Sequence, residues 1–76
     1  MTATVTFPDG TTATRVGATR WGFAVCCNYE GDAYAAAGWY VLRWCRTQKS
    51  AEAFKGDWDH LVVISTEISE TGLGDR

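Results

Sequence analysis

Residues 2–16 show the alternation of polar and apolar positions that is typical of a β-hairpin. Threonines alternate with alanine, valine and phenylalanine over residues 2–7, and a period of two with one apolar face predicts a half-buried strand. Residues 8–10 (Pro-Asp-Gly) supply turn chemistry, because proline presets φ and glycine accepts a positive φ. Residues 11–16 are rich in β-branched side chains, so we expect them to return as the second strand.

The third predicted strand, residues 20–29, has one bulky face and one small face. Alternate positions place Trp21, Phe23, Val25, Cys27 and Tyr29 on the bulky face and Gly22, Ala24, Cys26 and Asn28 on the small face. A face of small side chains lets a helix, a ligand or another chain approach closely. We expect Trp21, on the bulky face, to belong to the core.

The segment after residues 30–32 has two interpretations. In the first, residues 33–37 form a loop or a single helical turn and residues 38–46 form a strand, because aromatic and β-branched side chains dominate there. In the second, Asp32 caps one long helix that runs to Lys55. An interior glycine would cost that helix about 1 kcal/mol relative to alanine, so the sequence favours the strand.

A short helix over residues 48–55 follows from the strand interpretation. Thr47 is suited to cap its first turn and Gly56 to end it. Ala51 and Phe54 then fall on the side that we expect to face inward.

Residues 60–69 form the clearest strand, and its first half is apolar on both faces, which is typical of a central position in a sheet. The sequence therefore predicts an α+β fold of order β-β-β-β-α-β, in which a mostly antiparallel sheet of about five strands is covered by one short helix. We expect residues 1–69 to form a single compact domain and the glycine-rich residues 70–76 to form a flexible C-terminal tail.

Composition narrows the class of protein. The chain has 76 residues, of which 46% are hydrophobic, so it predicts a small globular domain with a thin core. A net charge of −2 with only seven Lys and Arg residues disfavours direct nucleic-acid binding as a global role. An odd number of cysteines argues against a disulfide scaffold. Because neither a signal-peptide pattern nor a membrane-length apolar run is visible, we expect a cytoplasmic protein that does not associate with membranes.

The candidate chemical groups do not form a recognisable catalytic or metal site. Cys26 and Cys27 are adjacent in a strand and must point to opposite faces, so they cannot easily share a metal. His60 is the only histidine, and a Cys–His nucleophile would also need an orienting third group. Buried cysteines commonly act as small hydrophobes. We therefore expect no catalytic residue, no metal and no cofactor, and a protein that is not an enzyme.

The aromatic side chains predict a protein-binding role. Four Trp, three Tyr and three Phe could together fill most of a thin core, or two or three of them could stand on the surface as binding anchors. Trp58 lies between Asp57 and Asp59 and suits a partner that presents Arg or Lys. Trp39 and Trp44 lie five residues apart in one strand and are expected on opposite faces, so only one belongs to the core. The candidate partner-binding residues are Trp58, Asp57, Asp59, Tyr34, Trp39, Trp44, Glu30 and Asp32.

An alternative function is binding of RNA or single-stranded DNA through an arginine and aromatic sheet face. Arg43 and Arg46 are interleaved with Trp39, Tyr40 and Trp44. Aromatic side chains on a sheet face can stack bases while the arginines pair with phosphates. The overall negative charge of the chain opposes this interpretation.

In size, acidity and lack of catalytic residues, the whole chain resembles the very small single-domain proteins of phages and mobile elements. That resemblance implies an inhibitor of the anti-CRISPR or anti-defence type, which acts in the host cytoplasm by occupying a surface stoichiometrically. The implied partner is a host protein or ribonucleoprotein complex. Because thin cores often need additional support, a homodimer through the apolar faces is a further option.

Overall fold

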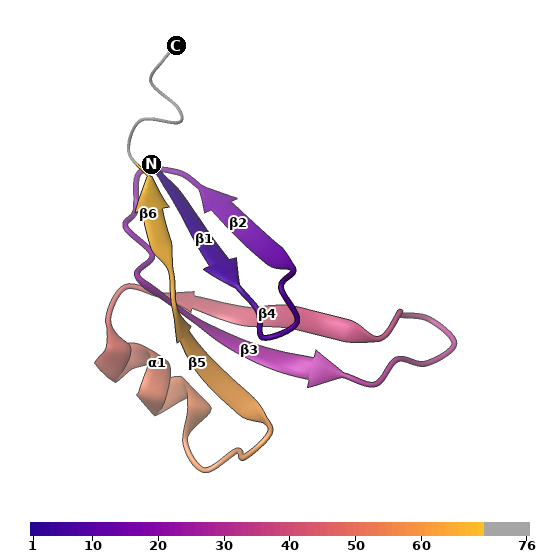
Figure 1. Cartoon of the computed structure of the whole chain (residues 1–76). Coiled ribbons are helices and arrows are strands. Elements are labelled where there is room, and N and C mark those ends of the chain that lie inside the picture. Colours follow the sequence, from indigo (N-terminus) through magenta and orange to yellow (C-terminus); the bar gives the residue numbers. More distant parts are fainter. Residues whose placement is uncertain (70–76) are drawn as a thin grey trace.

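The computed structural model describes residues 1–69, which form six strands and one helix (Figure 1). In chain order these are β1 (Thr2–Thr6), β2 (Thr12–Val16), β3 (Phe23–Tyr29), β4 (Gly38–Cys45), α1 (Gln48–Lys55), β5 (Leu61–Ser65) and β6 (Glu67–Ser69). The α+β class with antiparallel pairing and one short helix is confirmed. The expectation of one sheet with about five strands is wrong, because the strands form two three-stranded sheets of order β2-β1-β6 and β4-β3-β5.

The two sheets arise because the last predicted strand divides at Thr66. β5 pairs with β3 in one sheet, and β6 pairs with β1 in the other. At the crossing, the Thr66 hydroxyl donates to the carbonyl of Trp21 at 2.7 Å, and the Thr66 amide donates to the carbonyl of Gly22 at 2.9 Å. A strand that bends can switch between packed sheets and form their common corner. Here the bend at Thr66 connects the β4-β3-β5 sheet to the β2-β1-β6 sheet.

The small face of β3 packs against the first hairpin. Ala24 and Cys26 are fully buried there, together with Val5 and Phe7 from the β1 side. Short side chains on β3 let the β2-β1-β6 sheet approach closely. Close packing on this face agrees with the sequence prediction, which left open what would cover it. The chain therefore uses this face for its own core.

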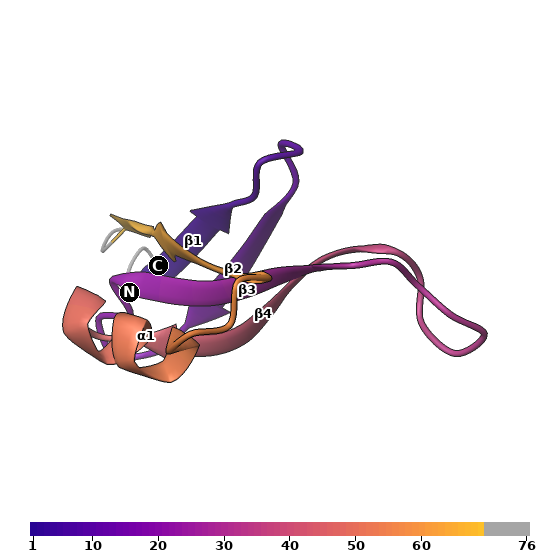
Figure 2. The ribbon, with the colours of Figure 1, turned by 90° about the horizontal axis from the view of Figure 1, so that it is seen from below.

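Helix α1 covers the opposite face of the β4-β3-β5 sheet (Figure 2). Ala51 of the helix is buried with Val25, Cys45 and Leu61. β3 is thus covered on both faces, and its central residues Ala24, Val25 and Cys26 are completely buried.

The ends of α1 agree with the sequence prediction. The Thr47 hydroxyl accepts a hydrogen bond from the Ser50 amide at 3.1 Å, and the Gly56 amide donates to the carbonyl of Glu52 at 2.9 Å. The alternative of one long helix from Asp32 is wrong. Phe54 also departs from the expectation that it faces inward, because 42% of it is exposed.

Strand β4 contains a β-bulge at Leu42. Arg43 lies opposite Val25 and Val41 lies opposite Cys26, so Leu42 has no partner in β3. An extra residue on one strand shifts the alternation of side chains beyond it by one position. Side chains on the two sides of Leu42 therefore follow different phases.

The bulge corrects the predicted placement of two tryptophans. Strict alternation would put Trp39 and Trp44 on opposite faces, but the extra residue brings both against the core between the sheets. Trp39 stacks on Phe7 with ring centroids 5.9 Å apart and an interplanar angle of 15°. Both indoles contribute to the core, so the expectation that only one does is wrong.

Within residues 1–69, no helix has the length and apolar character needed to cross a membrane. The expected tail over residues 70–76 lies outside the described residues.

Deletion of Leu42 tests whether this residue is the extra residue of the bulge. Without it, Trp39 and Trp44 are four positions apart, so regular alternation keeps both indoles on one face and retains every other pairing with β3. We expect chemical denaturation to show a free energy of unfolding within about 1 kcal/mol of the wild-type value.

Leu42→Thr is the matched control, because Leu42 is 48% exposed and the bulge stays in place. Its effect should be within about 0.5 kcal/mol. A deletion that costs about 3–5 kcal/mol, as the loss of a buried tryptophan does, would show that one indole leaves the inter-sheet core and would contradict this account of the bulge.

Candidate functional site

The candidate residues from the sequence fall in three places that do not form one surface cluster. Glu30, Asp32 and Tyr34 lie in the β3–β4 connection; Asp57, Trp58 and Asp59 lie between α1 and β5; and Trp39 and Trp44 lie on the inner face of β4. Figures 1 and 2 show the β3–β4 connection projecting well beyond both sheets and away from α1. We call this connection, residues 30–37, the finger.

The finger displays one large side chain. Tyr34 is 96% exposed, and residues 33–37 around it are four alanines and this tyrosine, all exposed. An apolar segment without charge at the outermost point of a small domain does not stabilise the fold. The Tyr34 side chain and the neighbouring alanines are therefore accessible for contact with another molecule.

Asp32 holds the finger in a defined conformation. Its carboxylate accepts hydrogen bonds from the backbone amides of Tyr34 at 2.7 Å and Ala35 at 2.9 Å. The Asp32 amide in turn donates to the carbonyl of Ala35 at 2.8 Å. An aspartate that bonds the amides just after it closes the chain in the same way as a backbone turn.

Two tyrosines brace the base of the finger. The Tyr29 hydroxyl donates to the Asp32 carboxylate, and the Tyr40 hydroxyl donates to the carbonyl of Ala36. The Tyr29 and Tyr40 rings meet edge to face, with centroids 6.1 Å apart. Sequence analysis missed these supporting roles, although tyrosines at facing ends of two strands are the signal that could have revealed them.

Gly31 permits the finger to close tightly. Its φ of 92° lies in the region that favours glycine, and a Cβ there would lie 2.8 Å from the backbone nitrogen of Ala37. Any larger residue would force the two sides of the finger apart.

The same hydrogen bonds shift two pKa values in opposite directions. The phenol of Tyr29 and the amides of Tyr34 and Ala35 lower the pKa of Asp32. The bond to Asp32 raises the pKa of Tyr29. These shifts favour the carboxylate and the neutral phenol, which are the protonation states that hold the finger together.

The α1–β5 turn exposes Trp58, which is 62% accessible. Its ring meets His60 edge to face, with centroids 5.4 Å apart. Its backbone is fixed in the turn, since its amide donates to the carbonyl of Lys55 at 3.1 Å and its carbonyl accepts from Leu61 at 3.2 Å. The partner-binding role of Trp58, Asp57 and Asp59 stays a prediction.

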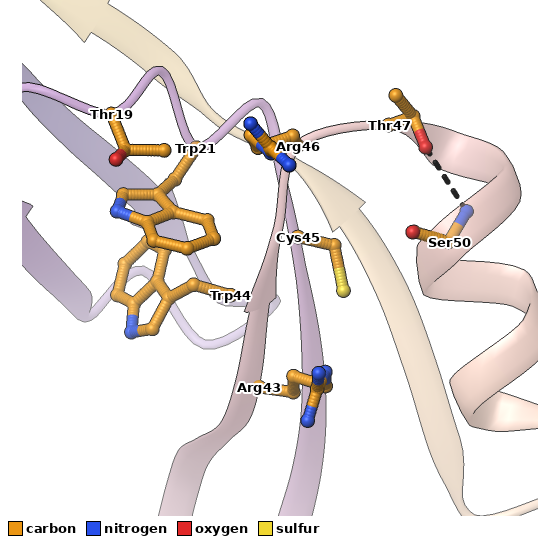
Figure 3. Close-up of a pocket in the computed structure, with 8 residues that line it drawn as sticks. All are labelled: Thr19, Trp21, Arg43, Trp44, Cys45, Arg46, Thr47 and Ser50. Atoms are coloured by element: carbon orange, nitrogen blue, oxygen red, sulfur yellow. Dashed lines mark hydrogen bonds between the residues drawn. The ribbon is translucent and has the colours of Figure 1, made fainter.

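A cavity of about 570 Å³ lies where the end of β4 meets the start of α1 (Figure 3). Its lining is formed by Thr19, Trp21, Arg43, Trp44, Cys45, Arg46, Thr47 and Ser50. The indoles of Trp21 and Trp44 both belong to this lining. We call this cavity the tryptophan–arginine pocket.

Trp21 is placed differently from its predicted position in the core. β3 begins at Phe23, so Trp21 precedes the strand and does not share its alternation. It is only half-buried, and the guanidinium of Arg15 lies over its ring at 5.0 Å from the centroid. Sequence analysis missed Trp21 and Arg15 as surface groups because their proximity depends on how the two sheets are packed.

Cys26 shows no activation for nucleophilic chemistry. Cys26 is completely buried, and burial, together with the neighbouring Cys27, raises the pKa of its thiol to about 11. Reactive cysteines require a lowered pKa and access to solvent. Within the described part of the chain, no three His, Cys, Asp or Glu side chains come together in a way that could hold a metal ion.

Comparison of the chain with protein-family models, with curated proteins and with solved structures finds no match.

The order of the finger is expected to depend on Asp32 and on pH. Because the pKa of Asp32 is lowered in the fold, its stabilising bonds are present above its unfolded pKa of about 3.9 and are lost as pH falls through the folded value. Because the pKa of Tyr29 is raised, its bond is present below about pH 10 and is lost as pH rises through the folded value.

Asp32→Ala should therefore accelerate solvent exchange of the Tyr34 and Ala35 amides by roughly fivefold at neutral pH, as measured by NMR. Asp9→Ala is the matched control, because Asp9 bonds the Thr11 amide at 2.9 Å in the other hairpin. That variant should affect Thr11 and spare the finger. Unchanged exchange at Tyr34 and Ala35 in Asp32→Ala would show that the finger is not held by this carboxylate.

Proposed function

We propose that this protein is a non-enzymatic binding module whose finger inserts into a cleft of a protein partner. The observation that carries the proposal is the projection of residues 30–37 beyond both sheets, with Tyr34 96% exposed near its end. Tyrosine is frequent at energetic hot spots, since it offers a large, amphipathic surface with few rotatable bonds.

The internal bonding of the finger supports this role. Asp32 closes the loop through two backbone amides, and the Tyr29 and Tyr40 hydroxyls tie both sides of it. A loop that is already ordered loses less conformational entropy when it binds, so more of its contact energy appears as affinity. A rigid, protruding loop is well suited to a concave surface.

The chemistry of the finger favours a protein partner over a nucleic acid. Residues 33–37 carry no cation, and Glu30 and Asp32 at its base are acidic. Phosphate groups would be repelled there, because nucleic-acid affinity depends on Lys and Arg contacts. Alanines around a tyrosine instead match an apolar protein cleft with a polar group that can meet the phenol.

We further propose that the protein acts by occupying its partner's surface stoichiometrically, as an inhibitor of a host protein or ribonucleoprotein complex in the cytoplasm. The support is the resemblance in size and acidity to small phage proteins that block host defence, together with the buried Cys26 thiol, whose pKa burial raises. Binding alone is sufficient for this mode of action.

Tyr34→Ala tests the assignment of the finger. Affinity-tagged wild-type protein should retain a host partner at a fixed molar ratio, and Tyr34→Ala should weaken that complex by about 30-fold or more, as expected for a hot spot. The free energy of unfolding should not change, because the side chain is almost fully exposed.

Two variants on other surfaces serve as controls. Val16→Ala removes an apolar side chain that is 59% exposed on β2, and Trp58→Ala removes one that is 62% exposed in the α1–β5 turn. Both should retain the partner. If Trp58→Ala loses it while Tyr34→Ala keeps it, the binding surface is the α1–β5 turn and the finger assignment is wrong.

A further inference from the structure

The tryptophan–arginine pocket carries a chemistry opposite to that of the finger. None of the eight described residues that line it is acidic, and Arg43 and Arg46 are among them. Arg15 adds a third guanidinium at the ring of Trp21. Three of the chain's seven basic residues therefore gather around one cavity.

None of the described carboxylates belongs to the lining of the pocket. Asp9 occupies the β1–β2 turn, Glu30 and Asp32 lie in the finger, Glu52 lies on α1, Asp57 and Asp59 lie in the α1–β5 turn, and Glu67 lies in β6. The net charge of −2 is thus a sum over regions of opposite charge, and the region around this pocket is basic. An argument from total charge against nucleic-acid binding does not apply to this pocket, because electrostatic attraction at a surface falls off within about 10 Å at ordinary salt.

Two indole rings give the pocket flat surfaces suited to stacking. Trp44 is held by its packing on the inter-sheet core, and the guanidinium of Arg15 lies over the ring of Trp21. Both indoles belong to the lining of the pocket (Figure 3). Bases stack on aromatic side chains with little dependence on sequence, and each such contact changes affinity by roughly fivefold to over a hundredfold.

The arginines of the pocket lie on different elements. Arg15 comes from β2 and lies over Trp21 at 5.0 Å from the ring centroid. Arg43 comes from β4 but lies on the α1 face of the sheet, where its guanidinium lies over Phe54 at 5.3 Å from the ring centroid, so it does not flank the indoles. Arg46 follows β4 directly, ahead of α1. Cations distributed around a stacking surface match phosphates that flank a base, and the volume of about 570 Å³ lies within the usual range for small-ligand sites.

We propose that the tryptophan–arginine pocket binds single-stranded nucleic acid, with a base stacked on the Trp21 and Trp44 indoles and the adjoining phosphates paired with Arg15 and Arg46. A duplex would keep its bases stacked on each other and could not present one to the rings. An acidic peptide would satisfy the arginines but would leave the indole faces without an aromatic partner. This site is independent of the finger and of the function proposed for it.

The proposal is tested by titrating the full chain with an unstructured eight-nucleotide oligomer at about 50 mM salt. Tryptophan fluorescence should be quenched on binding, because stacked bases quench indoles. The logarithm of the affinity should fall with the logarithm of salt concentration with a slope of about −1.4, which corresponds to two phosphate contacts. Absence of binding at this salt concentration overturns the proposal.

A pair of exposed cations provides the matched comparison. Arg46→Ala should weaken binding roughly tenfold and reduce the magnitude of the salt slope by about 0.7. Lys49→Ala removes the same charge from an exposed position on α1 outside the pocket lining, and should have little effect. Equal losses in the two variants would show diffuse charge attraction and contradict a defined site.

Further measurements distinguish single-stranded nucleic acid from other anions. Trp21→Leu should remove most of the fluorescence quenching, and the amide NMR spectrum of this variant should show that the fold is retained. A mononucleotide should bind more weakly than the oligomer, and poly-glutamate should not compete. Equal binding of the mononucleotide, or competition by poly-glutamate, would overturn the strand assignment. Tyr34→Ala should bind the oligomer as the wild type does, so this test fails or succeeds separately from the test of the finger.

Discussion

The structure depends on the close packing of the small face of β3 against the first hairpin. Ala24 and Cys26 are completely buried there with Val5. In a chain this short, one strand must carry two cores, because the opposite face of β3 packs on α1. Larger side chains at these positions would push the sheets apart, and Thr66 could then no longer guide the last strand from one sheet into the other.

The bulge at Leu42 decides which aromatic side chains remain for function. It directs both Trp39 and Trp44 toward the inter-sheet core. Trp44, near the end of β4, also lines the tryptophan–arginine pocket. Tyr34 is left at the end of a finger that the sheets do not cover. The two surfaces differ in chemistry, one apolar with acidic flanks and one aromatic with arginines. A ribonucleoprotein partner would present ligands suited to both.

Features that depend on neighbouring residues could be predicted from the sequence, and features that depend on distant pairing could not. The first hairpin and the cap at Thr47 follow from local turn and capping chemistry. The crossing at Thr66 and the bulge at Leu42 follow from how strands far apart in the chain pair with each other. The position of Trp21 outside the core could not be predicted for the same reason, because its ring contacts Arg15 at the end of β2.

The most direct test of this account is an NMR measurement of the contacts made by the two inner tryptophans of β4. If the bulge brings both indoles to the same face, nuclear Overhauser effects should connect Trp39 with the Phe7 ring and Trp44 with the Ala24 methyl group. If only one of the two indoles shows contacts with the inter-sheet core, the strand alternates regularly, and the account of core and pocket given above is contradicted.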